Sequence, residues 1–252
     1  MARLAAVTAA VAATAGGSAR AATNSSAQAT DYHLSVGPGY YQYPRYPGGR
    51  GSRDLLFPFI DAEYAGRFYM TANDLFGVYG YKTEASQLGA ALEYDPTRRN
   101  ANAGEPLLRE LPNVKDTLRF KLFGSHTIGI VTGDMNIARD IEGHGQGTLG
   151  QANLWLTAPF DPTFSVSVGP GVTWADSRYM HTFFAVPTIA AMPRAGIADV
   201  HWNGLAEWQL LSKYRLGATA TVANLNGDAA SSPIAVRRRQ TTVTGWIAYR
   251  FN

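Results

Sequence analysis

The sequence predicts an all-β fold, a transmembrane antiparallel up-and-down β-barrel of about 12 strands. The first observation behind this prediction is the stretch TFSVSVGPGVTW, in which apolar side chains take every even position from Phe164 to Trp174 while Ser, Thr or Gly take every odd one. Strict alternation describes a strand with one apolar and one polar face. A strand that crosses a bilayer needs roughly 9 to 11 residues, whereas a soluble strand usually has about 5 to 6.

Composition is the second observation. The chain has 26 Gly, 12% aromatic residues and only 16% charged residues, against a typical charged share of about 25%. The body of the chain contains no run of about 18 uncharged apolar residues, which excludes a helical membrane protein. The formal net charge is +3, but the basic residues are scattered except at 237–239. This run is expected to meet lipopolysaccharide or solvent, and no nucleic acid partner is indicated.

The N-terminal residues predict export. Residues 1–21 combine one arginine, an Ala/Val-rich run and a small-x-small ending, which indicates a secretory signal peptide cleaved after Ala21. A mitochondrial presequence and a soluble helix are the alternatives. Residues 22–31 are small and polar and predict a flexible lead-in, so the barrel is expected over 32–252. The chain has no Cys, which excludes disulfides and a lipoprotein anchor.

The five segments before residue 96 are predicted strands of uneven regularity. Segment 33–43 has apolar side chains on most even positions and mostly Ser or Gly opposite them, whereas segment 54–64 has bulk on both faces. Segments 67–73 and 75–82 form a short pair. Segment 87–95 alternates leucine, alanine and tyrosine with glycine, alanine and glutamate. Each of these segments is therefore assigned to the barrel wall.

The middle segments contain the clearest charged face. Segment 117–126 places three large apolar side chains opposite Arg119 and Lys121, an arrangement that suits a wall between lipid and a polar lumen. Segment 128–139 has a mixed pattern of apolar and polar side chains. Segment 148–158 sets alanine and leucine opposite glutamine, asparagine and threonine, and the TFSVSVGPGVTW strand follows it.

The last three segments, 199–211, 214–224 and 241–251, alternate clearly. Aromatic residues near predicted strand ends match the aromatic girdles of membrane barrels. These residues are Tyr94, Trp174, Trp202, Tyr214 and Tyr249.

The third observation is that long and short connections alternate. Membrane barrels of bacteria have an even strand number, short periplasmic turns and longer extracellular loops. The pattern requires 67–82 to be two strands, which gives twelve; ten is the alternative if two weak segments do not span. The expected long loops are 44–53, 96–116, 140–147, 175–198 and 225–240, and the expected turns are 65–66, 83–86, 127, 161–162 and 212–213.

Several motifs resemble one family. GPGVTWADSRYMHTFFAV, AGIADV, YRLGATATVANLNGDAASSPIAV and the closing WIAYRFN are similar to the MipA/OmpV family, whose name denotes an MltA-interacting protein. The resemblance covers about residues 32–252 and implies an integral barrel of the outer membrane of a Gram-negative bacterium. Phe183-Phe184-Ala185 stands where the family usually has Tyr-Phe-Gly, and Asn252 follows the terminal aromatic. One founding member is described as a scaffold between a lytic transglycosylase and a murein synthase, and others as porin-like or adhesive.

Candidate functional residues divide into a lumen set and a loop set. Charged or polar side chains on predicted inner faces could line a pore or pair and fill it: Glu93, Arg119, Lys121, His201, Glu207, Arg215 and Arg250. The apolar loop 175–198 could fold inward as a constriction, form a surface helix or bind a partner, and its candidate residues are Tyr179, Met180, Phe183 and Phe184.

No catalytic, metal or cofactor site is predicted. The chain has no G-x-S-x-G motif, no pair of His at ligand spacing on one strand, and a loop EGHGQG without repeated carboxylates. The expected function is therefore a non-enzymatic envelope scaffold that contacts lipid, lipopolysaccharide and murein enzymes. A narrow porin-like channel for small solutes is the alternative, and an exported β-sandwich is disfavoured by strand length.

Overall fold

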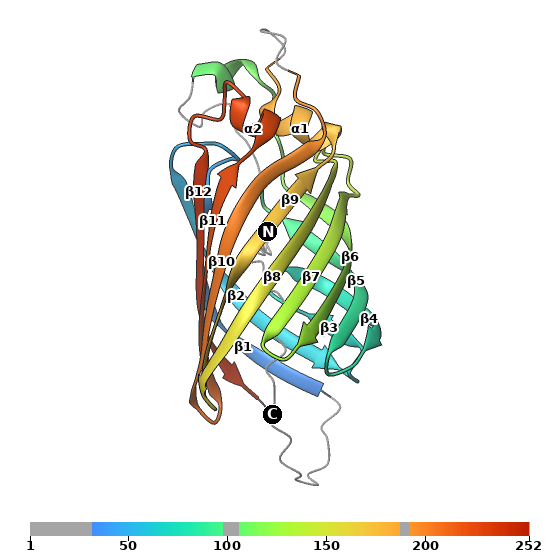
Figure 1. Ribbon diagram of the computed structural model, residues 1–252, viewed down its shortest axis with the longest axis vertical. Coiled ribbons are helices and arrows are strands. Elements are labelled where there is room, and N and C mark those ends of the chain that lie inside the picture. The colour runs from blue at the N-terminus through green and yellow to red at the C-terminus, as the bar shows by residue number, and fades with distance from the viewer. Residues whose placement is uncertain (1–31, 98–105, 187–191, 252) are drawn as a thin grey trace, which may run out of the picture.

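Twelve strands close into one antiparallel barrel in the computed structural model, which describes residues 32–97, 106–186 and 192–251 (Figure 1). The predicted fold class and strand number are confirmed. Neighbouring strands in the chain are neighbours in the wall, and β12 pairs with β1. The strands are β1 Tyr32–Pro44, β2 Ser52–Tyr64, β3 Phe68–Met70, β4 Asp74–Lys82, β5 Ser86–Asp95, β6 Thr117–Ile128, β7 Val131–Asp140, β8 Thr148–Asp161, β9 Phe164–Ala175, β10 Gly196–Leu211, β11 Tyr214–Leu225 and β12 Arg239–Arg250.

The strand register gathers the apolar faces on the outer surface. Val168 of β9 pairs with Gly204 of β10, and Trp202 of the same β10 face has 62% of its surface exposed. Leu56 and Met135, on opposite parts of the wall, are 78% and 66% exposed. Large apolar side chains on the outside and polar ones inside are the arrangement of a barrel surrounded by lipid.

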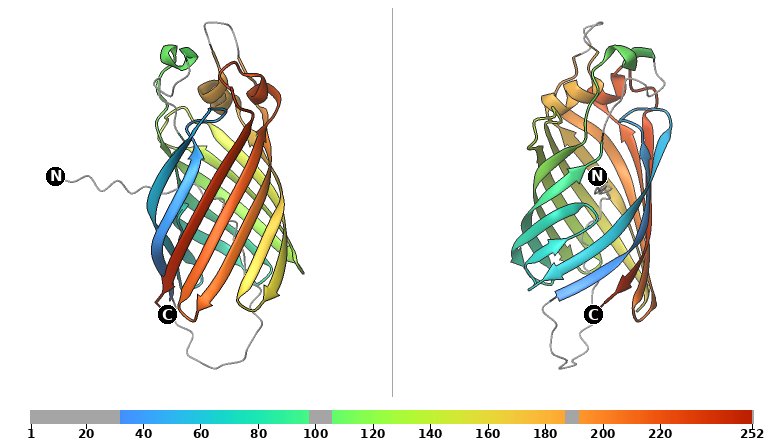
Figure 2. Two further views of the ribbon diagram at one scale, coloured as in Figure 1. Left: turned by 90° about the vertical axis from the view of Figure 1, so that its left-hand side faces the viewer. Right: turned by 180° about the vertical axis from the view of Figure 1, so that it is seen from behind.

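All long connections lie at one end of the barrel, which we call the upper end. Figures 1 and 2 show the helices η1 Pro106–Glu110, α1 Ser177–Phe184 and α2 Gly227–Ser231 at this end, above the tilted strands. Apart from the short β3–β4 connection, the tight turns lie at the opposite, lower end, together with the C-terminal end of β12. No helix in the described part of the chain is long and apolar enough to cross a bilayer.

The turn between β6 and β7 differs from the prediction. The sequence placed it at Thr127, whereas β6 continues to Ile128 and the chain turns at Gly129 and Ile130. Gly129 has a φ of 61°, a left-handed conformation that glycine adopts without steric cost. Thr127 pairs with Thr132 in the ladder instead.

The strand β3 is much shorter than the predicted segment 67–73. It pairs with β2 only from Ala62 to Tyr64, so in the described residues the upper part of β2 has a strand partner on its β1 side alone. The carbonyl of Tyr64 accepts a hydrogen bond from Arg67, on the β3 side. Successive residues of a strand direct their N–H and C=O groups to opposite sides. The even-numbered residues of β2 therefore direct these groups to the open edge. Pro58, which has no N–H, is one of them.

The stretch SVGPG occurs at 35–39 in β1 and again at 167–171 in β9, and it has the same local structural role in both strands. An N–H group is missing at Pro38 and Pro170, and the preceding glycines lie against a neighbouring strand. A Cβ atom on Gly37 would lie 1.8 Å from the carbonyl oxygen of Ile247, and one on Gly169 would lie 1.7 Å from that of Leu154. Both strands therefore approach a neighbour more closely than any side chain would allow.

Candidate functional site in the barrel interior

Arg119 of β6 is fully buried in the upper interior. Its Nε donates to Asp95 of β5 at 2.8 Å, and one terminal nitrogen donates to the side-chain oxygen of Gln146 at 2.8 Å. The other terminal nitrogen lies 3.4 Å and 3.5 Å from the backbone carbonyls of Gln146 and Gly147. A buried guanidinium requires several such partners, and here they come from the wall and from the loop between β7 and β8.

Two further contacts tie the loops to this arginine. The Gln146 amide donates to the carbonyl of Thr97 at 2.9 Å and to that of Lys115 at 2.5 Å, at the two ends of the β5–β6 loop. Asp140 accepts from the hydroxyl of Thr117 at 2.6 Å and from the backbone N–H of Gln146 at 2.9 Å. The upper loops are thus anchored on the interior face of the wall.

Lys121 lies two residues along β6 from Arg119 and forms a second buried ionic group. Its ammonium pairs with Glu93 of β5 at 3.1 Å and with Asp74 of β4. Two carboxylates therefore compensate one buried ammonium, and none of the three side chains is more than 19% exposed.

A third ionic group lies on the other side of the barrel. Arg215 of β11 pairs with Glu207 of β10 at 2.8 Å and with Asp61 of β2 at 3.3 Å. His33 of β1 approaches the same Asp61 at 3.4 Å. Arg250, at the lower end of β12, lies beside buried Ser35 in the ladder. Opposite charges from several strands therefore meet within the barrel.

His201 belongs to a polar network that joins β7, β8 and β10. Its ring nitrogens contact Asp199 at 2.7 Å and the side-chain oxygen of Asn153 at 2.9 Å. The Asn153 amide donates to Asp134, which also accepts from the indole N–H of Trp155 at 2.7 Å. The ring is held between an acid and an amide, and in the described residues no hydroxyl or thiol contacts it in the position of a nucleophile.

An aromatic and aliphatic cluster lies inside the barrel. Trp155 of β8, Leu205 of β10 and Trp246 of β12 are buried together, and Phe59 of β2 packs against them. The rings of Phe59 and Trp246 stack with centroids 5.1 Å apart and an angle of 4° between their planes. Because β8 and β2 are six positions apart in the closed order of twelve strands, the cluster joins opposite walls.

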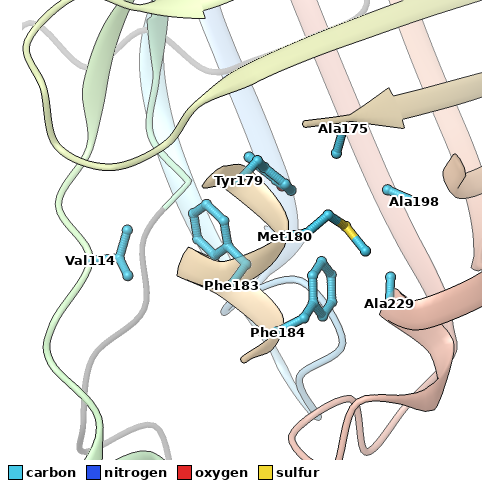
Figure 3. Close-up of a cluster of buried hydrophobic side chains, with 8 residues drawn as sticks. All are labelled: Val114, Ala175, Tyr179, Met180, Phe183, Phe184, Ala198 and Ala229. Carbon is cyan, nitrogen blue, oxygen red and sulfur yellow. The ribbon is translucent and has the colours of Figure 1, made fainter. Parts of the chain in front are cut away.

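The helix α1 occupies the upper mouth. Asp176 caps it by accepting the Tyr179 backbone N–H at 2.8 Å, and Tyr179, Met180, Phe183 and Phe184 are all buried. Figure 3 shows these four side chains facing the region of Ala175, Ala198 and Ala229 on one side and Val114 on the other, and they form one cluster.

Contacts with neighbouring loops hold α1 in place. The hydroxyl of Ser232 donates to the carbonyl of Phe184 at 2.6 Å, and that of Thr182 to the carbonyl of Gly145 at 2.5 Å. Burial raises the pKa of Tyr179, with the nearby Asp95 acting in the same direction, so its hydroxyl stays neutral. The sequence-predicted loop residues are therefore the packed side of a helix, turned away from solvent.

One serine–histidine pair lies outside the interior. Ser86 of β5 and His126 of β6 face outward near the lower turns, with 2.7 Å between Oγ and Nδ1. In the described part of the chain no third group hydrogen-bonds the other ring nitrogen. A nucleophile–base pair is normally oriented by such a group, so this pair lacks the arrangement of a hydrolase site.

The partners of the predicted lumen residues include several that the sequence analysis missed. Asn153 lies on the polar face of the alternating segment 148–158, a signal that could have identified it, whereas its partner Asp134 lies in the segment 128–139, whose alternation the sequence analysis did not recognise. Asp74 and Asp95 lie at strand ends, where parity is weaker. Gln146 lies in a loop without any periodicity, and only the tertiary structure places it against Arg119.

A closed barrel of twelve strands with an apolar outer surface and a polar, charged interior defines the chain as an outer-membrane β-barrel. The family model described as MltA-interacting protein MipA matches residues 36–251, and the chain belongs to this family. A comparison with curated proteins finds no match.

Several solved outer-membrane proteins are similar in structure. An outer-membrane channel of Pseudomonas putida F1 has 12% identity and a TM-score of 0.46, covering 87% of this chain and 96% of the channel. The NanC porin has 5% identity and a TM-score of 0.41, covering 86% and 98%. OmpT of Vibrio cholerae has 10% identity and a TM-score of 0.35, covering 87% and 96%.

Proposed function

We propose that the protein is a non-enzymatic and non-conducting scaffold of the outer membrane, which holds murein-synthesising and murein-degrading enzymes near one another. The observation that carries the proposal is the cluster of Trp155, Leu205, Trp246 and Phe59, which joins opposite walls of the barrel. A twelve-stranded barrel has a modest interior, and in this proposal the two indole rings and their neighbours narrow it too far for solutes to pass.

The charges of the interior support the same function. Lys121 and Arg215 each contact two carboxylates, and Arg119 is surrounded by four acceptor atoms. Ion pairs of this kind stabilise contacts between strands, whereas a conducting pore has charged side chains that face passing ions. The buried face of α1 and its loop contacts close the upper mouth in this proposal.

The lower end is the side from which a scaffold would reach murein. Short turns of outer-membrane barrels face the periplasm. The lower turns here expose Ile130 and Leu211, which are 55% and 65% exposed, beside Lys213. Exposed apolar side chains beside a charge suit a protein contact. The family description names a protein that interacts with MltA, and we extend this kind of partner to the present chain.

Conductance of the refolded full chain in a planar bilayer tests the barrel. We expect silence from the wild type and steady conductance from a Trp155→Ala, Trp246→Ala variant, because removal of both rings opens the interior. Heat-modifiable gel mobility verifies that each protein is folded. Steady conductance of the wild type would instead support a narrow channel for small solutes.

Binding tests the scaffold itself. The refolded protein, immobilised in nanodiscs, is exposed to a purified lytic transglycosylase and a murein synthase, separately and together. We expect both enzymes to be retained together, and weaker retention with Ile130→Ser and Leu211→Ser. Retention of neither enzyme would refute the scaffold role, whatever the conductance.

Export belongs to the same proposal. Residues 1–21 lie outside the described residues, and their composition supports cleavage after Ala21 by signal peptidase. The mass of the protein purified from outer membranes is expected to correspond to a chain that begins at Ala22.

A further inference from the structure

Two loops at the upper end bring arginines together on one part of the rim. The β1–β2 connection contributes Arg45 and Arg50. The end of the β11–β12 connection and the first residue of β12 contribute the run 237–239, and all five side chains are exposed. The backbone N–H of Arg237 donates to the carbonyl of Gly48 at 2.9 Å. The two loops therefore form one basic surface rather than two separate ones.

A pocket of about 240 Å³ lies between these loops. Arg237 and Arg239 line it together with Gln42, Ser52 and Thr241. The buried amide of Gln240 supports it from below by donating to the carbonyl of Gly49 at 3.4 Å and to that of Arg237 at 2.6 Å. In the parts of the chain that the structure describes, neither Arg237 nor Arg239 forms an ion pair with a carboxylate.

Directly below this pocket the outer wall is hollowed. The hollow has a volume of about 400 Å³ and is lined almost wholly by apolar atoms of β1, β2, β11 and β12. Its floor is formed where Ala218 and Gly245 pair across β11 and β12, and its sides include Leu56, Leu216 and Ile247. A Cβ atom on Gly245 would have no neighbour closer than the Gly217 carbonyl oxygen, 4.0 Å away.

The polar pocket and the apolar hollow are adjacent along β1. Gln42 of the pocket and Tyr40 of the hollow are successive residues on the outer face of β1, about 7 Å apart along the strand. Their side chains meet at Asp54, which accepts from the Tyr40 hydroxyl at 2.8 Å and from the Gln42 amide at 2.9 Å. A lipid with a phosphate group at the membrane surface and an acyl chain below it would place the phosphate at the polar pocket and the chain in the apolar hollow.

We propose that this combined surface binds the phosphorylated, acylated glycolipid of the outer leaflet, the lipid A part of lipopolysaccharide. Arg237 and Arg239 contact a phosphate group, and one acyl chain lies in the hollow over Gly245. Guanidinium groups bind phosphate through paired hydrogen bonds, and an apolar hollow beside lipid accepts a hydrocarbon chain. The long-loop end of the barrel lies in the leaflet that contains this lipid.

The charge balance of the surface favours an anion. Within 45–54 and 235–241 there are six arginines, of which Arg53 points inward, and a single carboxylate, Asp54. Its Oδ1 accepts from Tyr40 and Gln42, and in the described residues it forms no ion pair with Arg237 or Arg239. An anionic headgroup would supply a counter-charge to Arg237 and Arg239.

The first test uses the full chain refolded in nanodiscs and requires no variant. Its affinity is measured for lipid A, for dephosphorylated lipid A and for inorganic phosphate. We expect lipid A to bind at least about tenfold more tightly than either of the others, because only lipid A has both the charge and the acyl chain. Equal affinity for the dephosphorylated lipid would overturn the role of the arginines, and equal affinity for inorganic phosphate would overturn the role of the hollow.

Matched variants locate the site. An Arg237→Ala, Arg239→Ala variant is expected to lose about tenfold in affinity for lipid A. Its control is Arg139→Ala, Arg178→Ala, which removes two exposed arginines from other parts of the upper end. Gly245→Leu fills the hollow, and Gly133→Leu, at an outward position of β7 where a Cβ has no neighbour within 4 Å, is its control. Equal losses in the variants and their controls would show that lipid A binds nonspecifically and would refute the site.

Discussion

Arg119 is the residue on which the upper interior depends most. Its guanidinium is the only cation near Asp95 for which the described residues show an ion pair, and it also supports two loop carbonyls. In Arg119→Met these acceptors stay buried without a charge partner, and we expect the free energy of unfolding to fall by about 3 to 5 kcal/mol. Urea unfolding in detergent, followed by tryptophan fluorescence, measures the change.

The control for this variant is Arg215→Met. The Arg215 side chain is 31% exposed, as its partners nearly are, so water compensates part of the loss. A decrease of about 1 kcal/mol or less is expected. Equal losses in the two variants would contradict the assignment of Arg119 as the buried anchor.

Gly169 shows that a glycine in a strand can be required by its neighbour. The added methyl group of Gly169→Ala would collide with the Leu154 carbonyl, a backbone atom that cannot rotate away. We expect a loss of about 1 to 3 kcal/mol in unfolding free energy. The matched change Gly133→Ala, where the Cβ has open space, should be neutral or slightly stabilising. A neutral result at Gly169 would show that β8 and β9 can separate without cost.

At the scale of elements, the helix α1 depends on its cap. Asp176 supplies the acceptor for the first turn, so Asp176→Ala is expected to cost about 0.5 to 2 kcal/mol of local stability. Limited proteolysis should then cut within 176–186 more rapidly while the barrel stays intact. Asp176→Asn retains an acceptor and should protect the helix nearly as well as the wild type; cleavage as fast as in the alanine variant would contradict the capping role.

Strands were predictable from the sequence because their two faces meet different solvents. Residues 163–174 alternate without exception, and the structure has β9 at Phe164–Ala175. The short β3 was not predictable, because alternation reports the faces of a segment and not the length of its partner ladder. The turn at Gly129 was missed because the pattern on either side of it remains compatible with a strand.

The interior was predictable only in part for a related reason. The alternation of side chains along β6 placed Arg119 and Lys121 on the same face. Their partners, however, come from strands and loops distant in the sequence. Asp95 is 24 residues from Arg119 along the chain, and Gln146 is 27 residues from it. Pairing across a barrel is a tertiary property, and no period in one sequence encodes it.

For the whole molecule, the described part of the wall has a weakly connected seam beside β2. The amides of Leu55, Phe57 and Phe59 point to β1, whereas those of Leu56 and Ile60 point to the open edge. We expect hydrogen exchange to be faster at Leu56 and Ile60 than at their odd-numbered neighbours, because exchange follows local opening. Residue-resolved exchange by NMR in micelles measures this, and equal protection at both sets would show that another segment covers the edge.

Pro58 gives this seam a further consequence during assembly. An unpaired strand edge is a template on which another chain can add a strand. Pro58 removes one donor from the middle of the edge, so an incoming strand would find an interrupted ladder. The short β3 leaves this edge of β2 open, and Pro58 makes the open edge a poorer template for another copy of the chain.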